Sequence, residues 1–139
     1  MAAEMLIEQL GLQPHPEGGW FRETWRSPAA DCARAACTAI HFLLKAGERS
    51  HWHRVDADEI WCWHSGSPIV LQIESEAGFI AHRLGADVAA GEQPQLIVPA
   101  GCWQAAEAGE GWALVTCVVA PGFRFEGFEL APSGWAPPG

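Results

Sequence analysis

The sequence has few basic residues and no long apolar run, and both absences limit what the protein can bind. Only 8 lysines and arginines stand against 17 aspartates and glutamates, which gives a net charge of -9 at pH 7. Phosphate affinity depends on clustered lysine and arginine, so we expect no general nucleic-acid binding. No apolar stretch approaches the roughly 20 residues that a transmembrane helix needs, and we expect no membrane partner.

The first residues also lack the features of a secretory signal. The segment MAAEMLIEQL carries acids where such a signal carries lysine or arginine, and no small-residue cleavage site follows an apolar core. We therefore expect a cytoplasmic location.

Cysteine pairs with the spacing of redox or metal-binding motifs are missing as well. The five cysteines, an odd number without a CxxC pair, are Cys32, Cys37, Cys62, Cys102 and Cys117. Because they lie mostly in apolar segments, we interpret them as reduced, buried side chains rather than ligands or nucleophiles.

What the sequence does contain is one helical segment followed by short strands. Residues 3–10, AEMLIEQL, place three aliphatic side chains on one face before Gly11, which predicts a short N-terminal helix. From Trp20 onward, turn residues separate about nine short segments with the pattern of strands. We predict one all-β domain over residues 1–139, with a core from about 15 to 131 and a flexible tail over 132–139. An immunoglobulin-like sandwich and a jelly roll both fit this pattern.

Two glycine-bounded motifs favour the jelly roll. Residues 47–66, GERSHWHRVDADEIWCWHSG, resemble the first motif of the cupin superfamily, G(X)5HXH(X)3E(X)6G, in which His53 and Glu59 take the histidine and acid positions. Val55 stands where that motif has its second histidine. The segment from Pro99 to Gln104 is similar to the second motif, PXG(X)2H, with Gln104 in place of the histidine. The two departures remove two of the four metal ligands that the superfamily uses.

Five further segments, HPEGGWF, WHRVDADEIW, PQLIVPAG, WQAAEAG and APGF, occur in the order found in a small uncharacterised cupin family. The resemblance runs from about His15 to Leu130. It implies a double-stranded β-helix, the cupin jelly roll, usually paired as a homodimer.

The predicted pocket centres on His53 and Glu59. Alternate side chains of a strand share a face, so Glu59, Trp61 and Trp63 point the same way, which the motif implies is the barrel interior. By the same rule we expect His51 and His53 to share a face. Without a metal, His53 and Glu59 can act as general base and general acid, because burial raises the pKa of a carboxyl group.

A second resemblance bears on the ligand. GGWFRETW is similar to the RGxFxExF strand of dTDP-sugar epimerases, which are metal-free cupins, and it implies that Phe21 and Glu23 contact a nucleotide, in this chain or across a dimer. Gly18 replaces the arginine of that strand. Those epimerases use a tyrosine as their acid, and this chain has no tyrosine, which argues against the same reaction by the same residues. The objection concerns the reaction and not the ligand, which can still be a sugar, a nucleotide or a nucleotide-sugar.

The candidate site therefore has two parts. The candidate catalytic residues are His53 and Glu59. The candidate ligand-binding residues are Phe21, Glu23, His51, Arg54, Trp61, Trp63, Trp103 and Gln104. The arginines considered for phosphate or carboxylate oxygens are Arg22, Arg26, Arg54 and Arg83.

Our leading hypothesis is a pocket without metal or cofactor for a small molecule, with isomerisation or epimerisation as the reaction. One alternative is a metal-dependent oxygenase or isomerase in which His51, His53, Glu59 and Gln104 hold the ion. Another is a non-catalytic module that binds a metabolite.

Two features stay outside this hypothesis. We expect packing or solvent exposure for the scattered histidines, which are His15, His41, His64 and His82. Glu17 with Gly18 and Gly19 fits two interpretations equally, a close approach of the backbone to a ligand or subunit and a plain tight turn.

Overall fold

The computed structural model describes residues 2–31 and 33–138, so Cys32 lies outside the described residues. Helix α1 spans Ala3–Leu10 and ends at Gly11, whose left-handed backbone (φ 67°) lets its N–H bond to the carbonyl of Glu8. The strands are β1 (Gln13–Pro14), β2 (Trp20–Arg26), β3 (Thr38–Leu44), β4 (Arg49–Val55), β5 (Asp58–Gly66), β6 (Ile69–Ser75), β7 (Gly78–Leu84), β8 (Gln95–Val98), β9 (Gln104–Ala108), β10 (Ala113–Ala120) and β11 (Phe128–Leu130). Two short 3-10 helices are η1 (Val88–Ala90) and η2 (Phe125–Gly127).

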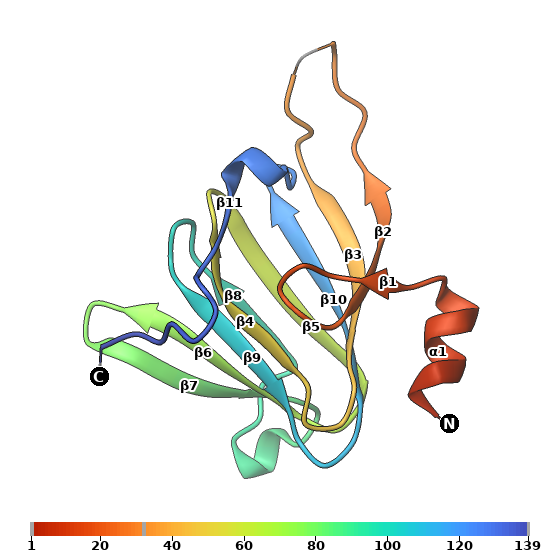
Figure 1. Ribbon diagram of the computed structural model, residues 1–139, viewed down its shortest axis with the longest axis vertical. Coiled ribbons are helices and arrows are strands. Elements are labelled where there is room, and N and C mark those ends of the chain that lie inside the picture. The colour runs from red at the N-terminus through yellow and green to blue at the C-terminus, as the bar shows by residue number, and fades with distance from the viewer. Residues whose placement is uncertain (1, 32, 139) are drawn as a thin grey trace.

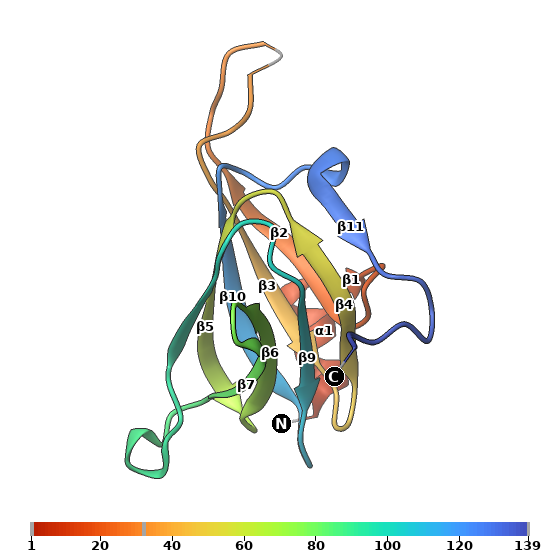
Figure 2. The same cartoon turned by 90° about the vertical axis from the view of Figure 1, so that its left-hand side faces the viewer.

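The strands form two antiparallel sheets, as expected for an all-β jelly roll (Figures 1 and 2). One sheet has the order β1-β2-β3-β10-β5-β8, and the other has the order β11-β4-β9-β6-β7. Some neighbours within each sheet, such as β3 and β10 or β4 and β9, are far apart in sequence, which is the crossed-over connectivity of a jelly roll. The expectation of an all-β jelly roll with a short N-terminal helix is confirmed.

The main core lies between the sheets and follows from period-two alternation. In β10, Ala113, Val115, Cys117 and Val119 are buried, whereas the residues between them are half-buried on the outer face. Ala113, Val115 and Cys117 meet Phe42 of β3, Trp61 of β5 and Leu71 of β6 in one apolar cluster. Burial of this face is the main stabilising term of the fold.

Helix α1 covers one end of the outer face of the six-stranded sheet. Its aliphatic residues Leu6, Ile7 and Leu10 pack with Leu43 of β3 and Trp20 of β2. This is the face that the sequence pattern predicted. Within the described residues, no helix is long and apolar enough to span a membrane.

The cysteines that the structure describes are free thiols. Cys117 is buried, and Cys37, Cys62 and Cys102 are half-buried. The interpretation of reduced side chains therefore fits these four, although only one of them is fully buried.

The C-terminal segment, which the sequence predicts to be a loose tail over 132–139, contacts the rest of the fold at Trp135. Trp135 packs against Trp103 and Trp52 on the outer face of the five-stranded sheet, with ring centroids 4.9 and 6.2 Å apart. The backbone N–H of Ala131 also bonds to the carbonyl of Trp52. The apolar area that Trp135 buries against these two rings offsets the conformational entropy lost when a segment rich in proline and glycine is ordered.

A tight loop between β1 and β2 is the feature of the fold that positions the site. The N–H of His15 donates to the carbonyl of Gly19 at 2.9 Å, and the N–H of Gly18 donates to the carbonyl of His15 at 3.0 Å. The N–H of His51 in β4 bonds to the carbonyl of Glu17 at 2.7 Å. Gly18 has φ 108°, and a Cβ there would lie 2.2 Å from the carbonyl oxygen of Arg49. The loop therefore lies directly against β4, as only glycine permits.

We predict that Gly18→Ala destabilises the fold more than Gly78→Ala, which serves as a matched control. Gly78 has nearly the same φ, 105°, but a Cβ there meets nothing within 4 Å. Gly78→Ala should cost only backbone strain, about 1–2 kcal/mol. Gly18→Ala adds the clash with β4, about 1–3 kcal/mol more. Urea unfolding of both variants measures this difference, and equal losses would show that the loop is free to move off β4.

Candidate functional site

A small cavity lies inside the barrel, where the β1–β2 loop meets the ends of β4, β5 and β10. Its volume is about 40 Å³, room for about three water molecules by the space one water needs. The lining residues are His15, Glu17, Phe21, Thr38, Ile40, His53, Val55, Glu59, Cys117, Val119, Phe123 and Phe128. The wall is mostly apolar, and four ionisable groups, two histidines and two glutamates, project into it.

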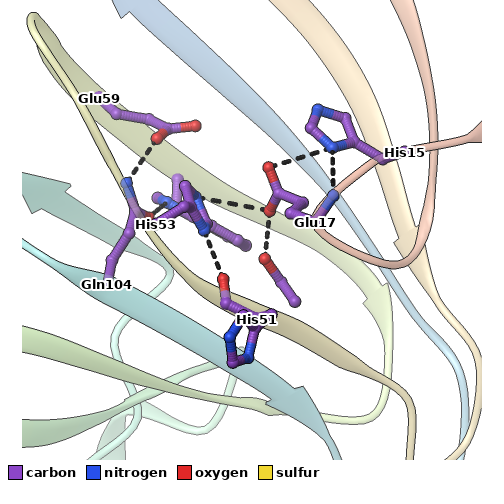
Figure 3. Close-up of polar contacts among 8 residues, drawn as sticks. His15, Glu17, His51, His53, Glu59 and Gln104 are labelled. Atoms are coloured by element: carbon purple, nitrogen blue, oxygen red, sulfur yellow. Dashed lines mark hydrogen bonds and ion pairs between the residues drawn. The ribbon is translucent and has the colours of Figure 1, made fainter. Parts of the chain in front are cut away.

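Glu17 lies between the two histidines of the cavity (Figure 3). One of its carboxyl oxygens, Oε2, is 3.5 Å from Nε2 of His53, and the other, Oε1, is 3.3 Å from Nδ1 of His15. The hydroxyl of Ser50 donates a hydrogen bond to Oε2. Burial raises the pKa of Glu17 above its ordinary value, against the opposing effects of His15 and Ser50.

His53 is held in one orientation by its own strand. Its Nδ1 lies 2.7 Å from the carbonyl oxygen of His51, so Nδ1 carries the proton and donates. In the neutral ring, Nε2 is then the basic nitrogen, and it faces Glu17. Burial lowers the pKa of His53, although Glu59 opposes this shift. The imidazole is therefore favoured in its neutral form, which is the form that can accept a proton.

His15 is also favoured as a neutral ring. Its Nδ1 accepts the backbone N–H of Glu17 at 3.1 Å, which places the ring proton on Nε2. Burial lowers the pKa of His15. The ring packs edge-on against Phe21 at 4.5 Å and against Phe128 at 6.0 Å, so it forms part of the aromatic wall.

Glu59 is oriented by a chain of two hydrogen bonds that begins in the core. The indole N–H of Trp61 donates to the amide oxygen of Gln104 at 3.0 Å, and the amide N–H of Gln104 donates to Oε1 of Glu59 at 2.8 Å. The bond to Trp61 fixes which end of the amide faces Glu59. Burial raises the pKa of Glu59 to about 7, reinforced by Glu17 and opposed by His53, Gln104 and Cys117. Near neutral pH this carboxyl group is therefore divided between its protonated and ionised forms.

The structure brings three of the predicted residues, Phe21, His53 and Glu59, to the cavity. Trp61 and Gln104 lie behind Glu59 in the core and do not line the cavity wall. Sequence alternation thus gave the face of Glu59 and Trp61 correctly, but only the acid reaches the open space.

The other predicted residues lie away from the cavity. Trp63 is half-buried against the core, and its indole donates to the carbonyl of Ser67 at 3.0 Å. Arg54 covers the ring of Trp103 at 4.7 Å on the outer face of the barrel and pairs with Glu129 at 2.8 Å. Glu23 lies outside the cavity and pairs with Arg26 at 2.7 Å.

His51 does not share a face with His53, contrary to the alternation rule. The pairing of β4 with β9 shifts register between Ser50 and His53, and one extra residue reverses the direction of the side chains. His51 therefore points away from the cavity, with Nε2 3.0 Å from the carbonyl oxygen of Pro132 (Figure 3). Ser50 takes the inward position beside Glu17.

Two ionisable residues that line the cavity, His15 and Glu17, were not among the predicted site residues. Both belong to the HPEGG segment, and the side chain of Glu17 is only 9% exposed. The signal in the sequence was the pair of glycines after Glu17, which allowed a close backbone approach. No pattern in the sequence indicates that His15 lies beside a histidine 38 positions further on.

The four positions that bind metal in the cupin motifs do not form a metal site here. Val55 lines the wall with an apolar side chain, and the amide oxygen of Gln104 accepts the indole N–H of Trp61. His51, the predicted replacement ligand, points outward. In the part of the chain that the structure describes, no group of three or more His, Cys, Asp or Glu side chains is arranged to hold a metal ion. The set of His51, His53, Glu59 and Gln104 is thus not brought together.

Comparison with known proteins places this geometry in a family. The model of a family described as "Cupin superfamily (DUF985)" matches residues 4–131. The crystal structure of protein SO0799 from Shewanella oneidensis is 42% identical, with a TM-score of 0.88 over 94% of this chain and 85% of that one. A hypothetical protein from Leishmania major is 34% identical, with a TM-score of 0.84 over 93% and 86%.

More distant structures share the fold. Oxalate decarboxylase from Bacillus subtilis is 18% identical, with a TM-score of 0.66 over 85% of this chain and 29% of that one. A search of curated proteins gave no match to the sequence. Since the family model covers nearly the whole chain and two structures exceed 30% identity, the chain belongs to the cupin superfamily, in the family described as DUF985.

Proposed function

We propose that the cavity is a metal-independent site that moves a proton on a small substrate, with isomerisation or epimerisation of a sugar or sugar derivative as the reaction class. The observation that supports this proposal is the buried imidazole of His53 between two carboxyl groups, Glu17 and Glu59, in an apolar cavity. Perturbed acids and bases gathered in a cavity are typical of catalytic sites.

His53, Glu59 and Glu17 each have one role in this reaction. Neutral His53 takes a proton from a carbon next to a carbonyl group, while protonated Glu59 donates its proton to the carbonyl oxygen. Glu17 stabilises the imidazolium that forms, because its carboxyl group lies 3.5 Å from Nε2. His53 then gives the proton to the former carbonyl carbon of the enediol, while Glu59 takes the hydroxyl proton of the carbon that was deprotonated, so the carbonyl group moves by one carbon and both residues are restored.

The size of the cavity limits what enters it. About 40 Å³ accommodates the reacting end of a molecule and not a whole nucleotide. Phe21 and Phe128 supply flat apolar walls on which the C–H face of a sugar can pack. If the ligand is a nucleotide-sugar, its nucleotide part must therefore lie outside the cavity. Phe21 reaches the cavity of its own chain, so a homodimer, which we still propose from the resemblance, is not needed to supply it.

The raised pKa of Glu59 predicts a pH-dependent stability that Glu59→Gln removes. The folded protein keeps a proton on Glu59 up to about pH 7, whereas the unfolded chain releases it near the ordinary value of 4.5. The contribution of protonated Glu59 to the unfolding free energy is thus fully present below pH 4.5 and is lost as the pH rises toward and through 7. The unfolding free energy of the wild type, minus that of Glu59→Gln, should fall by about 2–3 kcal/mol between pH 5 and pH 8.

Urea unfolding at the two pH values measures this difference, with Glu76→Gln as the control. Glu76 is exposed in the β6–β7 turn, and its replacement should leave the pH dependence of the wild type unchanged. If the difference between wild type and Glu59→Gln is the same at pH 5 and pH 8, Glu59 does not hold a proton at neutral pH and cannot serve as the general acid.

Exchange of carbon-bound hydrogen with solvent deuterium tests the reaction class directly. The protein is incubated in D2O with aldoses, ketoses, sugar acids and nucleotide-sugars, and NMR detects deuterium at carbons next to carbonyl groups. We expect exchange with at least one class of substrate, and a loss of about 100-fold or more in His53→Gln and Glu59→Gln. His82→Gln is the matched control, since His82 lies on β7 outside the cavity.

Two results would contradict the proposal. Exchange that requires an added divalent ion would show that the site depends on metal. Stoichiometric binding of one of these compounds, without exchange or turnover, would favour the non-catalytic binding module instead. Circular dichroism of both variants separates a loss of chemistry from a loss of folding.

A further inference from the structure

A second hollow, which we call the mouth, adjoins the cavity. The mouth has a volume of about 100 Å³ and is lined by Phe21, Glu23, Arg26, Ile40, Phe123, Arg124 and Phe125. Three of these residues, Phe21, Ile40 and Phe123, also line the cavity, so the two spaces share an apolar wall. The β2–β3 hairpin and the segment carrying η2 lie at this same end of the molecule (Figures 1 and 2).

The mouth differs chemically from the cavity. The cavity holds acids and histidines, whereas the mouth presents two guanidinium groups, Arg26 and Arg124, beside the exposed ring of Phe125. With Arg34 nearby, three of the 8 basic residues of an otherwise acidic chain gather at one end of the barrel. A guanidinium group is the side chain best suited to hold phosphate or carboxylate oxygens.

Existing ion pairs leave these guanidinium groups able to bind an anion. Arg34 holds Asp56 through two bonds of 2.6 and 3.1 Å, and Arg124 contacts the same carboxylate at 3.1 Å. Asp56 bonds chiefly to Arg34, whereas Arg124 makes one contact with it and is 49% exposed, so an anion can compete with Asp56 and the neighbouring Glu126 for Arg124. Arg34 also donates to the carbonyl of Gly122, which fixes the segment that carries Arg124.

Arg26 is paired with Glu23 at 2.7 Å, but both side chains are well exposed, at 47% and 37%. An exposed pair of this kind contributes little free energy. A ligand with a charged group can therefore displace Glu23 from Arg26 at small cost.

We infer that the mouth binds an oxyanion, phosphate or carboxylate, that belongs to the same substrate whose reacting end enters the cavity. The inference rests on the proposed function for its link between the two spaces. It narrows the substrate to an anionic sugar derivative, such as a sugar phosphate, a sugar acid or a nucleotide-sugar. The oxyanion lies between Arg26 and Arg124, the carbon skeleton passes Phe123, and the reacting carbon lies beside His53 and Glu59.

Titration of the intact protein with inorganic phosphate, and separately with acetate, tests the mouth alone. Both series are followed by NMR of the backbone and arginine side chains, at constant ionic strength with chloride. We expect saturable shifts at Arg26, Arg124 and Phe125, with a dissociation constant on the order of 1 mM for the preferred anion. Stronger binding of phosphate would identify a phosphorylated substrate, and stronger binding of acetate would identify a sugar acid.

Variants separate a specific site from general attraction. Arg124→Gln and Arg26→Gln should each weaken binding of the preferred anion about tenfold or more, whereas Arg83→Gln should have no effect. Arg83 is the control, because it lies on β7 away from the mouth and also pairs with a carboxylate, at 2.9 Å from the buried Glu92. Shifts that never saturate, or equal weakening by Arg83→Gln, would overturn the inference.

Two further readouts distinguish this inference from the proposed function. His53→Gln should abolish deuterium exchange but leave anion binding at the mouth unchanged. With a substrate in hand, Arg124→Gln should raise KM about tenfold with little change in kcat, because the anion is held equally in the ground state and transition state. If neutral sugars exchange deuterium at the full rate, the substrate need not be anionic and the inference about the mouth fails, whereas the proposed proton transfer in the cavity stands.

Discussion

Burial of the Glu17 carboxyl group between His15 and His53 is the interaction on which the site depends. Bringing an ionisable group from water into an apolar cavity carries a large cost unless it is paired and hydrogen-bonded. Here the partners come from two different parts of the chain, since Ser50 and His53 belong to β4 and His15 to the loop itself. The loop is held close only because Gly18, against β4, and Gly19, against β3, have no side chains to keep it away. The cavity is thus a consequence of backbone approach as much as of residue type.

The two departures from the cupin metal motifs have a common physical effect. A histidine at position 104 would direct a ring nitrogen toward the cavity, whereas Gln104 uses both ends of its amide, one for Trp61 and one for Glu59. Val55 makes the cavity wall more apolar than a histidine would. This strengthens the burial effect that raises the pKa of Glu59 and lowers that of His53. The lower polarity favours a carboxyl group that retains its proton, as proton transfer at neutral pH requires, whereas the amide N–H of Gln104 opposes this shift and fixes the orientation of Glu59.

The sequence predicted those parts of the structure that depend on local periodicity. The helix over residues 3–10 and the shared face of Glu59 and Trp61 follow from spacings of 3.6 and 2 residues. The face of His51 was predicted wrongly because alternation holds only while strand pairing stays in register, and β4 has a bulge that nothing in RSHWHRV indicates. The surroundings of His15 and Trp135 could not be predicted for a different reason. Each is positioned by contacts with residues remote in the sequence, namely Phe42 and Phe128 for His15 and Trp52 and Trp103 for Trp135.

The number of protons that the cavity holds decides what chemistry is available to it. If Glu17, Glu59 and both histidines all took their ordinary charges at pH 7, two negative charges would occupy about 40 Å³ with only neutral rings between them. Burial opposes this state, because it raises the pKa of each carboxyl group and lowers that of each imidazole. The stable arrangement near neutrality therefore keeps at least one proton within the group of acids and histidines. A proton held in this way is available to a carbonyl oxygen without first being drawn from solvent, and an unprotonated Nε2 stands beside it to receive another. The same arrangement explains why an anionic group of the substrate belongs in the mouth. In the cavity it would add a negative charge to a space that already disfavours the charge of its own carboxyl groups.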